Sequence, residues 1–330
     1  MRYLSASAIL SAVHAGDLLP AVAAGLSALH RHEAVNPPRL VMALPTQGGT
    51  VFAMPAFLPA LNALTMKYVA VFPDNVRQGR DGTPGLVILA DPATGEPAAL
   101  LDGTVVTRLR TGAVTALATD RMGMADVRVL GMIGAGGQAL GIAEGILAVR
   151  PHIRRVQVYA RAPEHRRRFL DALAARLQGW GEPSLDLRSA PSAEAAVVGA
   201  DVVVTATSSP TPVLEAGWIA PHAHVNAIGA FRATTAELPA GVFSHATAIA
   251  VDAPEEAREE AGDLIQAVAA GTLAWSRVEP LARWLDEDPP PEAPRTGPTV
   301  FKSVGVAALD AAVSRFLVDR VSAGVLDLPT

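Results

Sequence analysis

The sequence predicts an α/β protein of two domains, one of which contains a parallel sheet. Its 330 residues suffice for two cores; half of them are hydrophobic and 18% are charged, as is usual for a globular protein. From Val127 to about Val251, short apolar strands alternate with helical segments, a pattern typical of a parallel sheet covered on both faces. The earlier part of the chain contains strand-like segments punctuated by turns, which indicates a different kind of domain.

Composition excludes several classes of protein. The formal charge of -5 argues against a nucleic-acid partner, which needs a concentrated basic face. The absence of cysteine removes disulfides, thiolate nucleophiles and Cys-based metal sites, and it fits a cytoplasmic location. The N-terminus superficially resembles a signal peptide, but His14 and Asp17 interrupt its apolar run. The other apolar window, Leu130 to Val149, contains Glu144 and several glycines, so no membrane span is expected.

The first hundred residues contain two helical segments and then a series of strands. Ser5 and Asp17 are the expected N-caps of two short helices. Strands are expected in RLVMALP, TVFAMPAFL, LTMKYVAVFP and GLVILADPATGEPAALLDG, the last of which is typical of a hairpin with a Pro/Gly turn. A helix is expected over Val105–Arg121.

The alternating region supplies the second domain, and both chain ends supply the first. Residues 253–285 are expected to be helical and acidic, residues 286–298 to form a proline-rich loop, and residues 303–323 to form a last helix. The predicted division is residues 1–117 with 303–330 in one domain and residues 118–302 in the other.

A glycine-rich loop follows the first strand of the alternating region. The apolar run 127–133 ends in a G-x-G-x-x-A motif formed by Gly134, Ala135, Gly136, Gly137, Gln138 and Ala139. The first glycine permits a sharp turn, the second lets the backbone approach a pyrophosphate, and the alanine lets the next helix lie close to the sheet. The N–H groups and dipole of that helix then hold the anion. The motif predicts a Rossmann-type dinucleotide-binding domain.

The end of the next strand indicates which dinucleotide binds. NAD-binding domains usually place a carboxylate there for the ribose 2′-hydroxyl. Here the strand VQVYA ends without a carboxylate and is followed by Arg161, whose guanidinium can pair with a 2′-phosphate. We therefore expect NADPH as the cofactor. NADH is the alternative, if Arg161 is only a solvated loop residue.

Over nearly its whole length the sequence resembles the ornithine cyclodeaminase/μ-crystallin family. The matching segments, in order, are NPPRLVM, MKYVAVFPDN, GLVILADPATGEPAALLDG, RTGA, IGAGGQA, ADVVVTATSSPTPVL, HVNAIGA followed by AEL, and FKSVGVAALD. The resemblance implies a homodimer. In it, an α/β substrate-binding and dimerisation domain formed from both chain ends accompanies the Rossmann-type domain.

The resemblance also implies roles for individual residues. Arg39, Lys67 and Arg110 match the cations that bind the carboxylate of a small amino-acid-like substrate, and Lys67 and Arg110 are the catalytic candidates. Other matching positions lie around the cofactor, and one of them, Ser303, is also assigned to the substrate. These positions are Thr205, Thr207, Ser208, Gly229, Ser303 and Gly305.

One departure from the family pattern changes the expected reaction. Ornithine cyclodeaminases carry an Asp two residues after the Gly of the NAxG segment, and here Phe231 occupies that position. Phenylalanine cannot accept a proton or orient an amine, but it suits a preformed cyclic imine and helps to exclude water. The segment resembles that of the family's reductases, which implies reduction of Δ1-pyrroline-2-carboxylate and/or Δ1-piperideine-2-carboxylate to L-proline and L-pipecolate.

Three alternatives remain open at this stage. They are an ornithine cyclodeaminase that recycles its NAD, an alanine-dehydrogenase-like enzyme, and a μ-crystallin-like protein that binds NADPH or a small ligand without catalysis. The donor of the proton to the imine nitrogen is also open, between solvent, a bound water and Lys67. His222 and His224 form an H-x-H pair, but no third ligand is recognisable and no metal is expected.

Overall fold

The computed structural model describes residues 1–180, 185–286, 296–321 and 325–327 and divides the chain into two compact units. Unit 1 comprises residues 1–113 and 306–330, and unit 2 comprises residues 114–305. The expected α/β class is confirmed. The expected domain boundaries fall a few residues from these divisions, and the functions assigned to the two domains stay predictions.

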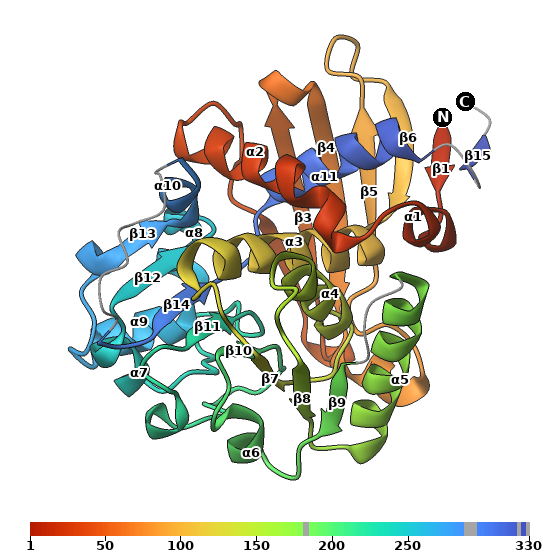
Figure 1. The fold of residues 1–330 in the computed structure, drawn as a ribbon. Coiled ribbons are helices and arrows are strands. Elements are labelled where there is room, and N and C mark those ends of the chain that lie inside the picture. The colour runs from red at the N-terminus through yellow and green to blue at the C-terminus, as the bar shows by residue number, and fades with distance from the viewer. Residues whose placement is uncertain (181–184, 287–295, 322–324, 328–330) are drawn as a thin grey trace. The chain divides into compact units, whose positions relative to one another are not determined.

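Unit 1 is built on a seven-stranded mixed sheet in the order β15-β1-β6-β5-β4-β3-β2 (Figure 1). The strands are β1 (Arg2–Leu4), β2 (Leu40–Leu44), β3 (Gly49–Leu58), β4 (Ala63–Val71), β5 (Gly85–Ala90), β6 (Pro97–Asp102) and β15 (Val325–Asp327). Its helices are α1 (Ala6–Ala12), α2 (Leu19–His30), the first half of α3 (Gly103–Met122) and α11 (Ala307–Arg320). Short 3-10 turns lie at Ala15–Leu18, Pro45–Gln47, Pro59–Leu61 and Pro73–Gln78.

Both ends of the chain contribute to this sheet. Strand β1 pairs with β15 in antiparallel orientation and with β6 in parallel orientation. Helix α11, blue in Figure 1, packs against β3, β4 and β5 and against α2. At the crossing with α2, a Cβ on Gly25 would lie 3.2 Å from Leu309 and 3.3 Å from Ala312, so the two helices approach closely. The expected strands and the β5–β6 hairpin are confirmed.

The two expected N-caps have different outcomes. Ser5 is the N-cap of α1, and its hydroxyl accepts a hydrogen bond from the Ala8 N–H at 3.3 Å. Asp17 was wrongly expected to cap the next helix. It lies within the 3-10 turn, and its carboxylate accepts a hydrogen bond from the His14 N–H at 2.8 Å. The cap is displaced because the 3-10 turn runs directly into α2, leaving Leu18 at that helix's N-cap position.

Unit 2 contains eight parallel strands in the order β13-β12-β14-β11-β10-β7-β8-β9. The strands are β7 (Val129–Ile133), β8 (Arg155–Tyr159), β9 (Asp186–Ser189), β10 (Val202–Thr205), β11 (His224–Ala227), β12 (Ala248–Val251), β13 (Val278–Pro280) and β14 (Thr299–Lys302). Its helices are α4 (Ala139–Val149), α5 (Pro163–Trp180), α6 (Ala193–Val197), α7 (Gly241–His245), α8 (Pro254–Glu260), α9 (Gly262–Ala269) and α10 (Leu281–Asp286). Two 3-10 turns lie at Ala216–Trp218 and Trp275–Arg277.

Both faces of the parallel sheet are buried. Along β10, Val203 packs into a core cluster shared with α6 to α9, whereas Val202 and Val204 pack into a second cluster with α4 and α5. Because successive side chains of a strand point to opposite faces, the two clusters cover the two sides of one sheet. The chain leaves β9 at one edge and re-enters beside β7 as β10, so the order of the strands reverses between β7 and β10.

Two parts of this unit differ from expectation. The region 253–285 is not continuously helical, because a 3-10 turn and the edge strand β13 separate α9 from α10. Residues Thr299–Lys302 form the central strand β14, between β12 and β11, and the last helix begins only at Ala307. The four-residue run follows the proline-rich segment, and only its neighbours in the sheet reveal it as a strand.

Within the described ranges, none of the helices alone combines the length and apolar composition of a membrane span. The bent pair Ala6–Ala12 with Ala15–His30 meets these two criteria together.

Candidate dinucleotide and carboxylate sites

The glycine-rich loop lies at the point where the strand order of unit 2 reverses. It connects the carboxyl end of β7 to the start of α4 at Ala139. Gly134 has a φ of +111°, and a Cβ there would overlap the carbonyl oxygen of Ala206 after β10. Gly136 and Gly137 differ from Gly134, because a Cβ on either would meet nothing within 4 Å. The loop therefore has a packed glycine at its base and open space above its tip, which fits a pyrophosphate held by backbone N–H groups.

A second glycine, Gly229, lies two residues after the end of β11 and packs against the segment that follows β10. A Cβ on Gly229 would overlap the Thr207 carbonyl oxygen, so the segments that follow β10 and β11 are in direct contact. Ligands in open α/β sheets bind outside the carboxyl ends of the strands at the switch point. Thr207, Ser208 and Gly229, which the resemblance assigns to the cofactor, are at that edge, and their contact with a cofactor stays a prediction. Ser208 is exposed and the other two are half-buried.

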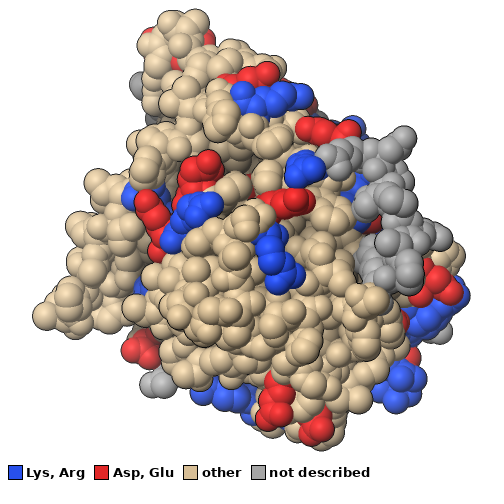
Figure 2. All heavy atoms as spheres, turned by 90° about the vertical axis from the view of Figure 1, so that its left-hand side faces the viewer, with Lys and Arg blue, Asp and Glu red and all other residues tan. Residues whose placement is uncertain are grey.

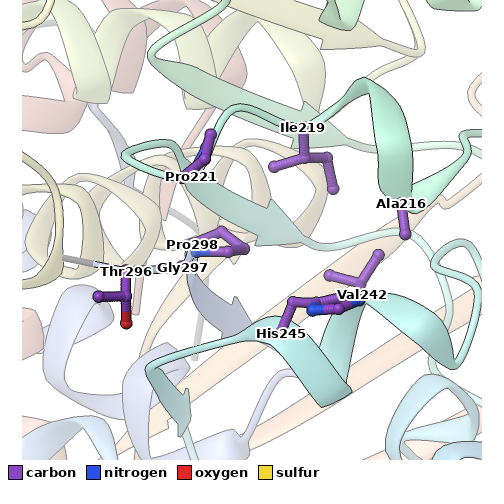
Figure 3. A pocket seen from close by; sticks show the side chains of 8 residues that line it. All are labelled: Ala216, Ile219, Pro221, Val242, His245, Thr296, Gly297 and Pro298. Carbon is purple, nitrogen blue, oxygen red and sulfur yellow. The ribbon is translucent and has the colours of Figure 1, made fainter.

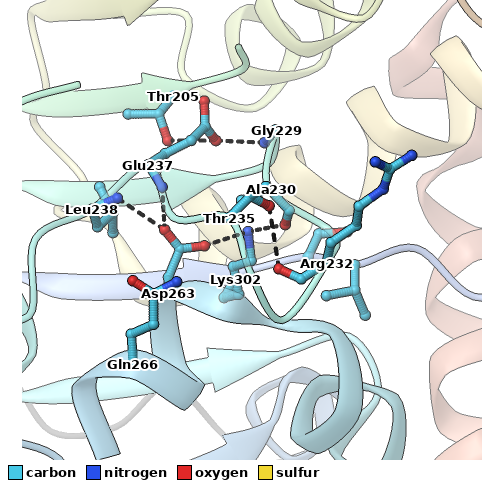
Figure 4. Close-up of polar contacts among 12 residues, drawn as sticks. Thr205, Gly229, Ala230, Arg232, Thr235, Glu237, Leu238, Asp263, Gln266 and Lys302 are labelled. Atoms are coloured by element: carbon cyan, nitrogen blue, oxygen red, sulfur yellow. Dashed lines mark hydrogen bonds and ion pairs between the residues drawn. The ribbon is translucent and has the colours of Figure 1, made fainter. Parts of the chain in front are cut away.

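One buried carboxylate holds these two segments together. Glu237 is fully buried and accepts hydrogen bonds from the Thr207 N–H and the Gly229 N–H, both at 2.6 Å. Figure 4 shows the contact with Gly229. It also accepts one from the Thr205 hydroxyl at 3.1 Å. Thr205, one of the expected cofactor residues, therefore has its side chain bound to Glu237. Burial raises the pKa of Glu237, while Lys302 and the hydrogen bonds from Thr207 oppose that rise.

Glu237 is itself anchored by an ion pair in the core. The Glu237 and Leu238 N–H groups donate to Asp263 Oδ1 at 2.6 and 2.8 Å. Asp263 Oδ2 lies 2.7 Å from Lys302 Nζ, and Lys302 also donates to the Ala230 carbonyl (Figure 4). The carboxyl edge of unit 2 is thus held by side chains from β10, β14 and α9 and from the segment after β11. Such a fully connected buried network gives a rigid edge.

A third carboxylate orders the turn after β14. Asp252 accepts hydrogen bonds from the Ser303 hydroxyl at 2.6 Å and from the Gly305 N–H at 2.8 Å. Gly305 has a φ of +76°, which favours glycine. Ser303, predicted to touch substrate and cofactor, is 3% exposed and has its hydroxyl bound to Asp252. Any part that it plays in binding must therefore involve its backbone or a change of this hydrogen bond.

Arg161 is exposed two residues beyond the end of β8. Its neighbour Arg166 is engaged elsewhere, because its guanidinium lies 5.6 Å from the centre of the Tyr159 ring and donates to the Ala190 carbonyl at 2.8 Å. In the described part of the chain, Arg161 has no hydrogen bond or ion pair. Arg161 is therefore available to meet a ligand at this strand end.

Unit 1 holds a cluster of cations around a buried aspartate. Lys67 lies on the face of β4 that α11 covers, and its Nζ is 2.8 Å from Asp310 Oδ1. Arg110 of α3 places its Nε 3.4 Å from the same oxygen. Lys67 is 1% exposed, Arg110 8% and Asp310 0%. Arg39 lies over the ring of Phe52 and close enough to Lys67 to affect its titration. The structure thus brings together the three cations that the sequence predicted for a carboxylate.

The surroundings of Lys67 make it unusually acidic. Burial lowers the pKa of Lys67 from 10.5 to about 8; Asp310 opposes this shift, whereas Arg110 and Arg39 add to it. The cluster holds more positive than negative charge, because two buried cations share one carboxylate. Among the described residues, Arg110 Nε and Asp310 Oδ2 have no hydrogen-bond partner. Buried charge in excess of its counter-charge is costly unless a ligand compensates it.

Phe231 lies in the loop after β11, four residues after Ala227. It is half-buried and packs against the core cluster of α6 to α9, and Arg232 lies 5.6 Å from the centre of its ring. Its proposed contact with the substrate ring stays a prediction.

The H-x-H pair makes two unrelated contacts. His222 is exposed and lies 2.9 Å from Asp201, whereas His224 is buried and lies 2.8 Å from the Thr299 hydroxyl. The two histidines thus have different partners, and the described residues contain no cluster of three or more candidate metal ligands.

A small pocket lies at the amino ends of the parallel strands, opposite the glycine-rich loop. It is lined by Ala216, Ile219, Pro221, Val242, His245, Thr296, Gly297 and Pro298 (Figure 3). These residues precede β11 and β14 or lie on α7, so the pocket is at the amino ends of the strands. Its volume of ≈ 160 Å³ is below that of ordinary ligand pockets, about 300–1,000 Å³. It is therefore a poor candidate for the dinucleotide site.

Surface charge adds no further site on the face drawn in Figure 2. Described acidic and basic side chains lie beside one another there, and the described basic ones form no large patch.

Four carboxylates that organise these sites were not predicted from the sequence: Asp310, Glu237, Asp263 and Asp252. Asp310 and Glu237 lie in the segments FKSVGVAALD and AEL, which were used only to identify the family. Asp310 could have been found from its flanking Ala, Leu and Val residues. They indicate a buried helix, and a charged residue in a buried helix needs a partner.

Known proteins with related sequences and structures cover almost the whole chain. A profile of the ornithine cyclodeaminase/mu-crystallin family matches residues 2–325. A Δ1-pyrroline-2-carboxylate reductase from Bacillus cereus (strain ZK / E33L) is 32% identical over 97% of this chain and 96% of its own length. The Δ1-pyrroline-2-carboxylate reductase of Thermococcus litoralis, solved with NADH and L-proline, superposes with a TM-score of 0.90 at 27% identity over 97% of each chain.

An archaeal alanine dehydrogenase, solved as a dimer with bound NAD, has a TM-score of 0.84 at 28% identity, over 97% of this chain and 96% of its own. The comparisons confirm the expected resemblance and support a nicotinamide dinucleotide as cofactor. The chain belongs to the ornithine cyclodeaminase/mu-crystallin family and is an NAD(P)H-dependent oxidoreductase of the imine-reductase type.

Proposed function

We propose that this enzyme uses NADPH to reduce a cyclic imino acid to the corresponding L-amino acid. The substrates are Δ1-pyrroline-2-carboxylate and/or Δ1-piperideine-2-carboxylate, and the products are L-proline and L-pipecolate. The observation that carries the proposal is the cation cluster of unit 1, where Lys67 and Arg110 share the single carboxylate of Asp310. The names and bound ligands of the related reductases support the same class of substrate.

The cation cluster is suited to an α-carboxylate. Arg110 contributes a planar fork, and its contact with Asp310 uses only the Nε side of the guanidinium. Lys67 donates one hydrogen bond to Asp310 and keeps two further N–H groups. A substrate carboxylate bound by Arg39, Lys67 and Arg110 would supply the negative charge that the cluster lacks and would fix the orientation of the imine.

The residues at the carboxyl edge of unit 2 are suited to the cofactor. The 134–139 loop and the start of α4 would hold the pyrophosphate, and the segments after β10 and β11, fixed by Glu237, would line the nicotinamide ribose. When bound, the reduced nicotinamide supplies a hydride to the imine carbon. We propose NADPH rather than NADH because β8 ends in Tyr159 without a carboxylate at its tip and Arg161 is exposed there.

Phe231 supports reduction over deamination. A cyclodeaminase needs a group that accepts a proton and orients an amine, and the half-buried Phe231 ring can do neither. An apolar ring instead helps to exclude water from the imine. The cofactor would then be consumed in each turnover. Separately, we propose that the enzyme works in the cytoplasm.

The experiment is to mix the protein with NADPH and each of three substrates and to follow absorbance of the reduced cofactor. We expect turnover with Δ1-pyrroline-2-carboxylate or Δ1-piperideine-2-carboxylate and none with pyruvate plus ammonia. Turnover only with pyruvate plus ammonia would indicate an alanine-dehydrogenase-like enzyme. NADPH binding without turnover on any cyclic imine would indicate a binding protein.

We also propose that the enzyme is a homodimer through the outer face of the unit 1 sheet. Leu40, Met42, Met66 and Tyr68 share one face by register, since Leu40 pairs with Ala53 and Ala53 with Tyr68. Each of these four side chains is 42–62% exposed. A contiguous apolar face of this kind marks an association surface, and the related alanine dehydrogenase is a dimer. Met66→Glu combined with Tyr68→Glu should give a monomer by light scattering, and an unchanged dimer would refute this surface.

A further inference from the structure

Of the 27 lysines and arginines in the chain, two are lysines, Lys67 and Lys302, and the others are arginines. Both lysines are buried, at 1% and 0% exposure, and each is paired with an aspartate. Arginine stays charged in proteins, whereas a buried lysine readily loses its proton. A lysine retained at such a position in an arginine-rich protein is therefore a candidate for proton exchange.

The two lysines differ in how fully they are bound. Lys302 Nζ contacts Asp263 and the Ala230 carbonyl, and Asp263 is fixed in turn by two backbone N–H groups. Lys67 Nζ has one acceptor among the described residues, Asp310 Oδ1 at 2.8 Å. Lys302 is therefore fixed as a structural group, whereas Lys67 keeps N–H groups with which to meet a ligand.

Asp310 is placed to control Lys67. It lies near the start of α11, is completely buried, and reaches Lys67 with one oxygen while Oδ2 has no hydrogen-bond partner in the described part of the chain. Among the residues that the structure describes, the charged groups that face Lys67 are Asp310 from α11, Arg110 from α3 and Arg39 from the segment before β2. Asp310 is the one anion among them, so it alone favours the protonated form of Lys67.

We propose that Asp310 is the positioning residue that keeps Lys67 protonated and aimed, and that Lys67 gives its proton to the imine nitrogen of the substrate. This inference rests on the proposed imine reduction and names its proton donor. In the reaction, a Lys67 N–H bond breaks and an N–H bond forms on the ring nitrogen. The imine carbon accepts a hydride from the nicotinamide, so the imine is reduced to the amine and NADPH is oxidised to NADP⁺. Solvent then reprotonates Lys67.

The pair predicts how activity changes with pH. With a pKa of about 8, Lys67 can donate a proton near neutral pH and loses that ability above pH 8. Removing the charge of Asp310 removes the one interaction that raises this pKa, so the pKa should fall. An opposite charge at this distance changes the pKa of its neighbour by about 1–3.

The test uses protein labelled with ¹³C at the lysine Cε carbons, which should give two signals. The Lys67 signal, assigned with Lys67→Met, should titrate near pH 8 in the wild type and about 1–3 units lower in Asp310→Asn. The alkaline limb of kcat/KM should move down by the same amount. Ser314→Ala, a buried change one turn further along α11, should move neither. The Lys302 signal provides an internal control for the fold.

Asp310→Glu keeps the charge and should restore most of the wild-type pH profile, and it replaces Asp310→Asn if that variant does not fold. A Lys67 pKa or an alkaline limb that is the same in Asp310→Asn and the wild type would overturn the proposal. If no imine is turned over, the proposed function fails, and the NMR titration still tests whether Asp310 controls Lys67.

Discussion

Substitution of Glu237 tests how the segments after β10 and β11 are held together at the carboxyl edge of unit 2. In Glu237→Gln the side chain keeps its shape, but one of its two oxygens becomes an NH₂ group. Glu237 Oε1 accepts from the Thr207 N–H, and Oε2 accepts from the Gly229 N–H and the Thr205 hydroxyl. Either orientation of the amide therefore places an NH₂ group 2.6 Å from a backbone N–H that needs an acceptor.

The size of the effect follows from those contacts. A hydrogen bond to a charged group contributes about 1.5–3 kcal/mol, and a buried donor left without a partner costs about 1–3 kcal/mol. We expect the free energy of unfolding to fall by about 2–3 kcal/mol, as measured by urea denaturation. Because the segments after β10 and β11 are then no longer held together, the affinity for NADPH should also fall, by about tenfold, if the displacement costs about 1.4 kcal/mol of binding energy.

Thr205→Val is the matched control. It removes a single donor to the same carboxylate and leaves both backbone N–H groups bound, so its loss of stability should be near 1 kcal/mol. Burial raises the pKa of Glu237, so the wild type should gain stability relative to Glu237→Gln as the pH falls and the carboxylate takes up a proton. Equal stability and equal NADPH affinity in Glu237→Gln and the wild type would refute the account of this edge.

Three further predictions concern separate parts of the structure. Gly134→Ala should destabilise unit 2, because its φ is +111° and its Cβ overlaps Ala206, whereas Gly136→Ala should leave thermal unfolding unchanged and weaken NADPH binding; equal stability losses would contradict this contrast. Arg161→Ala should lower the preference for NADPH over NADH by about 10- to 150-fold in kcat/KM, since a charge-assisted contact is worth roughly 1.5–3 kcal/mol, and an unchanged ratio would remove Arg161 from the cofactor site. The pKa of Lys67 falls from 10.5 to about 8 on folding, so its contribution to stability is present above pH 10.5 and lost as the pH falls through 8. As the pH rises from 8 to 10.5, the free energy of unfolding of the wild type, measured with denaturant, should increase by about 3 kcal/mol relative to that of Lys67→Met. A difference that does not change with pH would show that the pKa of Lys67 is not perturbed.

Local patterns were sufficient for the elements that have a strong period or a strict backbone requirement. In β3 of unit 1, buried residues largely alternate with half-buried ones, and the 134–139 loop needs glycine because it turns sharply directly after a strand. The same reasoning failed for β14, a four-residue run beside a proline-rich segment. It also failed for β1 and β15, which are strands only because the two chain ends meet.

The candidate sites show the same limit. Lys67, Arg110 and Arg39 were identified because their residue types and flanking sequence match the family, and the structure brings them together. Asp310 is 243 positions from Lys67 in the sequence, and Glu237 serves two strand ends that are 22 positions apart, from Thr207 to Gly229. Partners so distant follow from packing, which no local spacing encodes. A charged residue within an apolar segment predicts that it has a partner, but the sequence does not identify that partner.

The stoichiometry of the reaction shows whether the dinucleotide is consumed as a hydride donor. With Δ1-pyrroline-2-carboxylate, the enzyme should form one L-proline for each NADPH oxidised. With L-ornithine it should release no ammonia. Formation of L-proline and ammonia from L-ornithine without net change in the cofactor would contradict the claim, because it would show that the hydride is returned in every turnover.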